Sequence, residues 1–222
     1  MTPRIFVERL AATNLPDVFN PYADQCAVHD VPGAAAIRRK NLEHLLQAAR
    51  HLRVRSLWVG RDLGYRGGRR TGLALTDELC LPALSQAFGG IPLARATRGP
   101  PVAERTAAVI WRALNEVRRP VFMWNAFPLH PHERDAPFTN RCHTASERAE
   151  LTPLFLDLLE IIQPQHVVAV GKDASAALEA IGIPSVGVRH PSYGGQTDFF
   201  RGIREVYDLP EASFESRQPT FL

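Results

Sequence analysis

A glycine- and arginine-rich segment, residues 60–72, is the first place in the sequence where the residue types could do chemistry. It holds five glycines, four arginines and Asp62, directly after a run of apolar residues. Glycine lets a backbone approach a polyanion closely, arginine pairs with phosphate through a planar fork, and a carboxylate can activate water or stabilise a cation. The segment matches neither a P-loop nor a dinucleotide-binding turn. A solvated loop in which Asp62 only caps a turn is the alternative that the sequence leaves open.

Three further polar segments also follow apolar runs. Asn125 ends one of these runs, and its amide presents a donor and an acceptor together, as reading the edge of a flat heterocycle requires. Residues 171–174 can begin a helix whose N-terminus holds an anion, although simple capping by Asp173 explains them too. In residues 190–195, His190 precedes a proline and a glycine pair follows, so a neutral imidazole can donate a hydrogen bond to a developing anion.

Alternating strands and helices must position these segments. Short continuous apolar runs predict buried strands, and apolar residues at helical spacing predict helices. The predicted strands are 56–60, 121–124, 166–171 and 185–188, and the predicted helices are 32–52, 76–88, 106–118, 144–162 and 174–181. We therefore expect an α/β protein, a single-domain α/β/α sandwich around a mostly parallel sheet of roughly four strands. Ligands of such folds bind beyond the carboxyl ends of the strands, where the four polar segments should meet.

Composition places the chain among soluble globular proteins, with 45% hydrophobic and 22% charged residues. We expect one domain over residues 1–222, with a core of about 20–205 and an irregular C-terminal tail. No apolar run reaches the ~18 residues of a membrane span, and the N-terminus lacks the pattern of a secretory signal. Three scattered cysteines, Cys26, Cys80 and Cys142, exclude a disulfide framework and a four-cysteine iron–sulfur site. The expectation is a cytoplasmic monomer with free thiols and no membrane partner.

Basic charge is concentrated in the first half of the chain. Residues 1–119 hold 18 Lys and Arg against 10 Asp and Glu, whereas residues 120–222 hold 8 against 13. Every basic residue except Lys40 and Lys172 is an arginine. This asymmetry fits the recognition of nucleic-acid phosphates. A genomic base composition that favours arginine codons explains the arginine content equally well.

A group of histidines and one cysteine raises the question of a metal. His130, His132, Cys142 and His143 lie within one proline-rich stretch of the sequence. Their spacing fits no standard zinc site, and a polar loop explains the same composition. We therefore expect no metal and no cofactor.

Taken in order, the polar segments resemble the uracil-DNA glycosylase superfamily. That family has a water-activating motif after its first core strand, a base-reading Asn after the next, and a His-Pro-Ser motif near the C-terminus. Residues 60–64, Asn125 and residues 190–192 stand at these three places. In the form of this motif that carries an aspartate, the family has a further glycine twelve residues after the first one. Gly72 stands at that place, twelve residues after Gly60, without a gap. The resemblance extends over residues 20–200, which is most of the chain.

The resemblance implies a role for particular residues. The implied catalytic residues are Asp62, which positions water, and His190, which stabilises uracil O2. The implied base-recognition residues are Asn125, Gly64, Tyr65 and Leu75. The implied DNA-binding residues are Arg61, Arg66, Arg69, Lys172, Ser192, Tyr193 and Gly194. Among these, Tyr193 stands where the family commonly has a wedge that fills the gap left by a flipped base.

Several departures from the family pattern point to a divergent member. Gly64 occupies the place of the tyrosine that blocks the thymine methyl in the best-known branch, although other branches also have glycine there. Leu75 falls where the family usually has a phenylalanine that stacks on the base, and Arg61 replaces Gln or Glu. The cysteines of the iron–sulfur branches are missing as well. The resemblance therefore implies an enzyme without a cluster.

We accordingly predict a monofunctional DNA glycosylase that hydrolyses uracil from single- or double-stranded DNA in base excision repair, without a lysine nucleophile. Two alternatives remain from other functional classes. One is a non-catalytic nucleic-acid-binding protein of the same fold, and the other is a hydrolase of small-molecule nucleosides or bases. Salt-dependent binding separates nucleic-acid partners from small molecules, and turnover separates an enzyme from a binding protein.

Overall fold

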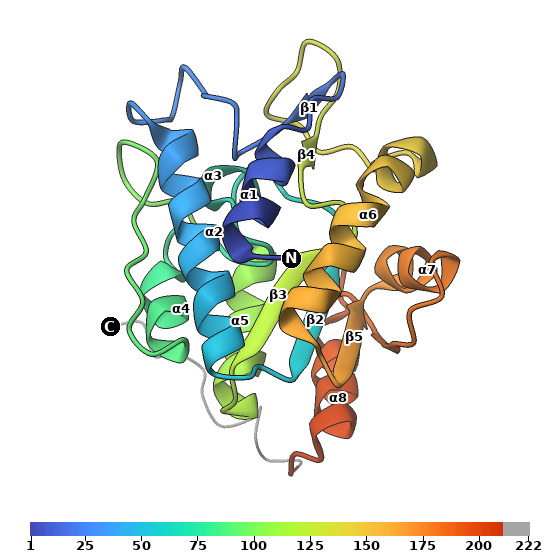
Figure 1. Cartoon of the computed structure of the whole chain (residues 1–222). Coiled ribbons are helices and arrows are strands. Elements are labelled where there is room, and N and C mark those ends of the chain that lie inside the picture. The colour runs from blue at the N-terminus through green and yellow to red at the C-terminus, as the bar shows by residue number, and fades with distance from the viewer. Residues whose placement is uncertain (211–222) are drawn as a thin grey trace.

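The computed structural model describes residues 1–210 and shows a four-stranded parallel sheet packed between helices (Figure 1). The elements are, in chain order, α1 (Pro3–Ala11), β1 (Val18–Phe19), α2 (Ala34–His51), β2 (Ser56–Gly60), α3 (Gly68–Thr71), α4 (Leu81–Ala87), α5 (Arg105–Val117), β3 (Val121–Asn125), β4 (His130–Pro131), α6 (Ala145–Ile162), β5 (His166–Val170), α7 (Lys172–Ala180), β6 (Val186–Val188) and α8 (Gln196–Tyr207). All four predicted strands are present as β2, β3, β5 and β6, so the apolar runs do form strands.

The order of the strands in the sheet is β3-β2-β5-β6, and every pairing is parallel. β2 and β3 are buried along their whole length, as continuous apolar strands between two helical layers should be. The register pairs Gly60 with Asn125, the last residues of β2 and β3. Because the strands are parallel, their carboxyl ends meet at one edge of the sheet.

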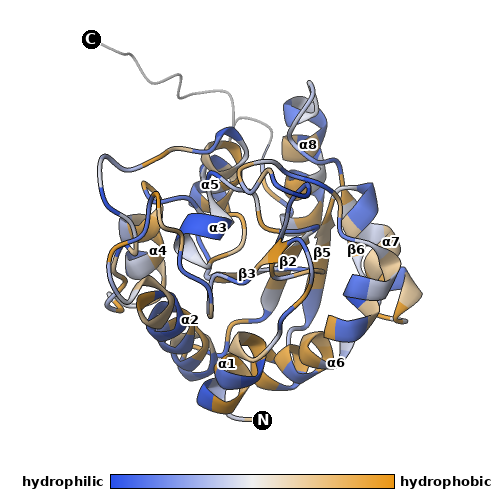
Figure 2. Ribbon diagram, turned by 90° about the horizontal axis from the view of Figure 1, so that it is seen from above, coloured by the Kyte–Doolittle hydropathy of each residue, from blue (hydrophilic) through white to orange (hydrophobic). Residues whose placement is uncertain are grey.

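Helices cover both faces of the sheet, as the view from above in Figure 2 shows. α1, α2 and α6 contact one another on one face, and α5 and α8 contact each other on the opposite face. Side chains from both layers enclose the central strands, where Leu57, Trp58 and Phe122 are fully buried. The predicted α/β/α sandwich with a four-stranded sheet is therefore confirmed.

Three helices, namely α1, α3 and α8, and a small sheet lie outside the elements that the sequence predicted. α1 buries Phe6 and Leu10, so the hydrophobic core begins before the expected boundary near residue 20. α8 packs its apolar face on the sheet, and Trp58 Nε1 donates a hydrogen bond of 2.8 Å to the hydroxyl of Tyr207. β1 and β4 form an antiparallel pair of two residues each. The last part of the expected C-terminal tail, residues 211–222, lies outside the described residues.

One predicted helix is shorter in the structure than in the sequence analysis. The prediction was residues 76–88, whereas α4 begins only at Leu81. The two acids before α4 are buried, and their side chains accept hydrogen bonds. Asp77 accepts one from the N–H of Cys80 at 3.0 Å, and Glu78 accepts one from Arg70 at 3.0 Å. These side-chain contacts hold the backbone in a loop where periodicity alone indicates a helix.

A capping box is present at the start of α6, formed by Thr144 and Glu147. Thr144 Oγ1 accepts a hydrogen bond from the N–H of Glu147 at 3.2 Å, and the Glu147 carboxylate accepts one from the N–H of Thr144 at 2.6 Å. α6 is one of the two longest helices described. Within residues 1–210, neither it nor any other helix is long and apolar enough to cross a membrane.

Candidate active site

A cavity of about 560 Å³ opens at the carboxyl edge of the sheet. Its wall includes residues from three of the predicted polar segments, namely residues 60–64 after β2, residues 171–173 after β5, and Arg189, His190, Ser192 and Tyr193 after β6. A volume of this size is typical of ligand sites. The parallel sheet thus brings together segments that lie far apart in the sequence.

Asp62 lies in the wall of this cavity, and its side chain is only 8% exposed. Arg61 Nε lies 2.8 Å from Asp62 Oδ2, and His143 Nδ1 lies 3.4 Å from the same oxygen. His143 is itself buried and stacks on Phe127, with ring centroids 5.2 Å apart. Arg61 therefore holds the carboxylate from one side, and His143 Nδ1 lies close to it without a hydrogen bond in this structure, with the cavity in front.

The role of His143 beside Asp62 was not predicted. In the sequence this histidine falls among possible metal ligands, and residues 62 and 143 are too far apart in the chain for spacing to connect them. His130 from the same group contacts Arg69 Nη1 at 2.9 Å and the carbonyl of Thr139 at 2.9 Å. In the described part of the chain, no group of three or more His, Cys, Asp or Glu residues could hold a metal ion.

Arg61 connects the loop after β2 to the start of α7. Besides its contact with Asp62, its Nη1 lies 3.0 Å from Asp173 Oδ2. The side chain is 34% exposed and forms part of the cavity wall. Arg61 was predicted to bind DNA, but in the structure its guanidinium holds two carboxylates. Asp173, which was considered as a helix cap, makes this ion pair instead of a side-chain cap, since α7 has none.

Asn125 is 1% exposed at the end of β3, directly beside the cavity wall. Its side-chain oxygen Oδ1 has no hydrogen-bond partner among the described residues. A buried acceptor without a partner costs about 1–3 kcal/mol, so it is an acceptor that a ligand N–H can satisfy. A Cβ at Gly60 would lie 2.5 Å from this oxygen. Glycine at position 60 is therefore required for the amide to occupy its place.

Leu75 lies in the cavity wall next to the same glycine. Its Cδ2 would be 3.1 Å from a Cβ at Gly60, which places the leucine side chain beside the Asn125 amide. Leu75 has a φ of 53°, a left-handed conformation that is costly for a bulky residue. Backbone strain of this kind concentrates at functional sites. The Leu75 side chain thus gives the cavity an apolar surface beside Asn125, where base recognition was expected from the sequence.

His190 presents a neutral imidazole to the cavity. The backbone N–H of Ser192 donates to His190 Nδ1 at 3.2 Å, and Ser192 Oγ lies 2.8 Å from the same nitrogen. Because a backbone N–H can only donate, Nδ1 is the acceptor and the ring proton resides on Nε2. Burial lowers the pKa of His190, and the charges of Arg61 and Arg189 lower it further. Ser192, predicted to contact DNA, here orients the histidine.

The turn after His190 projects an aromatic ring into solvent. Tyr193 is 97% exposed, and both Tyr193 and Gly194 have left-handed φ values, 50° and 75°. Lys172 begins α7 at the wall of the cavity and is exposed, and Arg66 is exposed on the loop after β2. These four residues, predicted to contact DNA, are therefore accessible around or near the cavity.

Two predicted site residues lie away from the cavity. Arg69 was expected to bind DNA, but it is 6% exposed, and its guanidinium lies over the ring of Phe19 at 3.6 Å. A stacked and buried guanidinium does not reach a phosphate in this conformation. Arg69 instead supports the loop from inside. Tyr65 was expected to contact the base, but it does not line the cavity. It lies with Arg69 and Phe19 around a small separate pocket, and its hydroxyl accepts a hydrogen bond from Arg66.

Glu104 is a cavity residue that the sequence analysis missed. It lines the wall together with Gly64, which was predicted to contact the base and does lie there. Burial raises the pKa of Glu104 to about 7, and the neighbouring Asp77 adds to the effect while Arg66 opposes it. In the sequence, an acidic residue near the start of a helix is common because it complements the helix dipole, so nothing local distinguished it.

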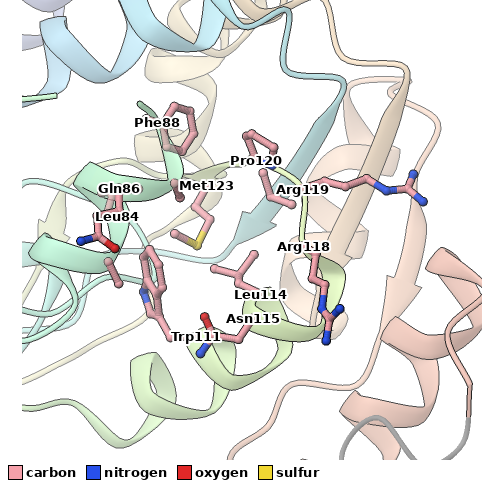
Figure 3. A pocket seen from close by; sticks show the side chains of 13 residues that line it. Leu84, Gln86, Phe88, Trp111, Leu114, Asn115, Arg118, Arg119, Pro120 and Met123 are labelled. Carbon is pink, nitrogen blue, oxygen red and sulfur yellow. The ribbon is translucent and has the colours of Figure 1, made fainter. Parts of the chain in front are cut away.

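A second cavity of about 330 Å³ lies at the opposite end of the sheet, where β3 begins (Figure 3). Its wall is largely apolar, with Trp111 and Met123 among the lining side chains, and Arg118 and Arg119 also line it. It contains none of the residues that the sequence analysis singled out. Ligands of parallel α/β folds bind at the carboxyl ends of the strands, so the cavity around Asp62 is the candidate active site.

Comparisons with known proteins give a relationship at the level of the fold. No family model matches the sequence, and no curated protein matches it. Among solved structures, the chain is similar to wild-type SMUG2 from Pedobacter heparinus, with a TM-score of 0.59 and 14% sequence identity. The alignment covers 94% of this chain and 96% of that one. The two proteins therefore share a fold over nearly their whole length.

Proposed function

We propose that the protein is a monofunctional DNA glycosylase that hydrolyses the N-glycosidic bond of uracil in DNA. The observation that carries the proposal is the joint presence of Asp62 and a neutral His190 in the wall of one cavity. Support also comes from the fold, because SMUG2 is a member of the uracil-DNA glycosylase superfamily. That structural similarity supports a DNA glycosylase in general. The choice of uracil as the substrate base rests on Asn125 and His190.

The two side chains suit the two halves of the reaction. When the bond between C1′ and N1 breaks, its electron pair leaves with uracil and the sugar becomes an oxocarbenium-like cation. The Asp62 carboxylate stabilises that cation and orients the water whose oxygen bonds to C1′. The Nε2–H of His190 donates to O2 of the departing uracil anion, a type of contact commonly worth several kcal/mol. The water proton is taken up by Asp62 or by solvent.

Asn125 supplies base recognition in this proposal. Its Oδ1 is a buried acceptor without a partner, and the N3–H of uracil is the donor that would satisfy it. Cytosine has no hydrogen on N3, so the same amide oxygen would face a lone pair. Binding of the wrong base would leave a buried polar group unpaired, which discriminates strongly between otherwise similar ligands.

A base in duplex DNA must be flipped out before it can enter the cavity. Tyr193 projects from the protein next to His190, where an exposed ring can stack in the gap that the base leaves. Lys172 and Arg66 supply exposed positive charge for neighbouring phosphates. Of the two lysines in the chain, only Lys172 lines the cavity, and its exposed side chain lacks the desolvation that activates a lysine nucleophile.

A base-release assay tests the proposal. Oligonucleotides with a single uracil, in single-stranded and duplex form, should yield free uracil and an intact abasic strand. Borohydride should trap no covalent complex through Lys172. Binding that falls with salt but gives no release from any deaminated base would favour a non-catalytic DNA-binding protein. Salt-insensitive release from free deoxyuridine would favour a small-molecule nucleoside hydrolase.

A further inference from the structure

The cavity where β3 begins lies at the opposite end of the sheet from the candidate active site (Figure 3). Its inner wall is apolar, because the buried side chains of Leu84, Phe88, Trp111 and Met123 line it. Its volume of about 330 Å³ falls at the lower end of the range for ligand pockets. Such a hollow suits one large apolar group of a ligand, which it would remove from water.

The charged residues that line this cavity, Arg118 and Arg119, are both positive. They precede β3, and Figure 3 shows both side chains extending away from the apolar wall. Both are exposed, and among residues 1–210 no carboxylate lies within ion-pair distance of either guanidinium. Unpaired cations beside an apolar hollow favour a ligand that carries negative charge next to an apolar group.

The positive surface continues beyond the cavity onto the neighbouring strand. Ser56 at the start of β2 is the register partner of Val121 at the start of β3, so Arg55 stands beside the loop before β3. Arg53 and Arg55 are exposed, and Arg55 Nη1 donates to Gln165 Oε1 at 3.1 Å. In the described part of the chain, neither arginine pairs with a carboxylate. A ligand that uses this whole surface must be extended and carry several negative charges.

The polar groups of the cavity favour a peptide over a nucleic acid as this ligand. Trp111 is 7% exposed, and its Nε1 makes no hydrogen bond with any described residue, so an acceptor such as a peptide carbonyl would be favourable there. The uncharged polar side chains of the lining, Gln86 and Asn115, are exposed. A nucleobase would bury its ring nitrogens and oxygens against the apolar wall, whereas the side chain of a phenylalanine or leucine has no polar atom to desolvate.

We propose that this cavity, together with Arg53, Arg55, Arg118 and Arg119, is a docking surface for an acidic peptide segment of a partner protein. A phenylalanine or leucine of the segment fills the cavity, and aspartates or glutamates on either side of it pair with the arginines. The surface lies at the amino ends of the strands, so DNA held at their carboxyl ends leaves it free. The inference goes beyond the proposed function: the partner binds while the enzyme is on its substrate.

Fluorescence polarisation with the full chain tests the inference. The probes are labelled peptides of about 12 residues, each with one phenylalanine or leucine between pairs of aspartate or glutamate. We expect saturable binding that weakens as salt is added, because the arginines are exposed to solvent. Peptides with serine in place of the apolar residue, or with asparagine and glutamine in place of the acids, should bind at least about tenfold more weakly.

Two variants locate the peptide on this surface. Arg118→Gln combined with Arg119→Gln should weaken binding at least about fivefold by removing two charges. Ala87→Trp places a large ring in the cavity from an exposed position on α4 and should weaken binding at least about tenfold. The matched control is Arg4→Gln combined with Arg134→Gln, which removes the same charge from two exposed positions outside the cavity and should leave the affinity unchanged. Thermal unfolding would verify that each variant is folded.

The outcomes separate this inference from the proposed function. Peptide binding that both variants weaken supports the inference, whether or not uracil is released. Peptides that do not bind up to about 1 mM, or that uracil-containing duplex displaces, overturn it. A labelled single-stranded oligonucleotide whose binding, unlike that of the peptides, depends on Arg118 and Arg119 assigns the surface to nucleic acid and overturns it. A dimer that the same two substitutions convert to a monomer assigns the surface to a second copy of the chain, and this outcome overturns it as well.

Discussion

Asn125 Oδ1 lies 2.5 Å from the point where a Cβ at Gly60 would stand. The two residues are register partners at the ends of β2 and β3, so the sheet itself brings them together. The amide is buried and its oxygen is unpaired, and it keeps this position only because residue 60 has no side chain. A contact below 3 Å with the added methyl group would force one of the two to move.

Gly60→Ala should therefore displace the Asn125 amide and weaken recognition of uracil. We expect kcat/KM for uracil release to fall at least about tenfold, the scale of one lost hydrogen bond. Circular dichroism and thermal unfolding would report whether the sheet is intact. The control is Gly89→Ala, because a Cβ there meets nothing within 4 Å; its left-handed φ of 82° adds a backbone cost that Gly60 does not have, so the control tests a more strained glycine replacement away from the site. An active Gly60→Ala enzyme would contradict the role of Asn125.

Asp62→Asn should lower the rate of base release by roughly 10²–10⁴, the range of a positioned acid–base group. The amide has nearly the same shape but cannot stabilise the sugar cation by charge. Binding of uracil-containing duplex should change little, because the contribution arises in the transition state. Single-turnover rates and dissociation constants would be measured together, and the control is Glu179→Gln, since Glu179 is an exposed acid on α7 outside the cavity. Near wild-type rates would remove Asp62 from the mechanism.

His143 is predicted to act through Asp62 as a positioning residue. His143→Phe keeps the stacking on Phe127 but removes the nitrogen 3.4 Å from the Asp62 carboxylate. We expect a lower kcat with little change in KM. In the Asp62→Asn background, the same substitution should cause almost no further loss, because the two residues act as one unit. Additive losses in this double-mutant cycle would show that His143 contributes only to the structure.

Tyr193→Ala should reduce activity more on duplex than on single-stranded DNA. The exposed ring can stack in the gap of a duplex, where such a contact is worth roughly 1–3 kcal/mol, whereas a single strand has no stack to hold open. His190→Ala should instead reduce the chemical step on both substrates alike. Equal losses on both forms of DNA for Tyr193→Ala would rule out a wedge.

The stability of the protein should depend on Glu104 in a defined pH window. Its pKa is raised from an ordinary value of 4.5 to about 7, so the folded state binds this proton more tightly than the unfolded state. The free energy of unfolding should consequently fall as the pH rises from about 4.5 to 7, and the loss should be complete above pH 7. Urea unfolding at pH 5 and pH 8 should show a smaller decrease for Glu104→Gln than for the wild type. An equal decrease for both would contradict a raised pKa.

The sequence by itself determined the sheet and the identity of several side chains at its carboxyl edge. Strands that are buried on both faces read as uninterrupted apolar runs, which is a local signal. The polar residue directly after such a run must lie at the edge of the sheet, so Asp62, Asn125 and His190 could be picked out one by one. The helix α6 was equally accessible, because its capping box is encoded within four residues.

Tertiary structure decided which of these residues act together and which do not. His143 reaches Asp62 from 81 positions away, and Glu104 reaches Gly64 across the loop before α5. Arg69 has the same local composition around it as Arg66, yet one is buried over Phe19 and the other is exposed. Burial, pKa and hydrogen-bond pairing depend on which distant segments pack together, and spacing along the chain does not specify that packing.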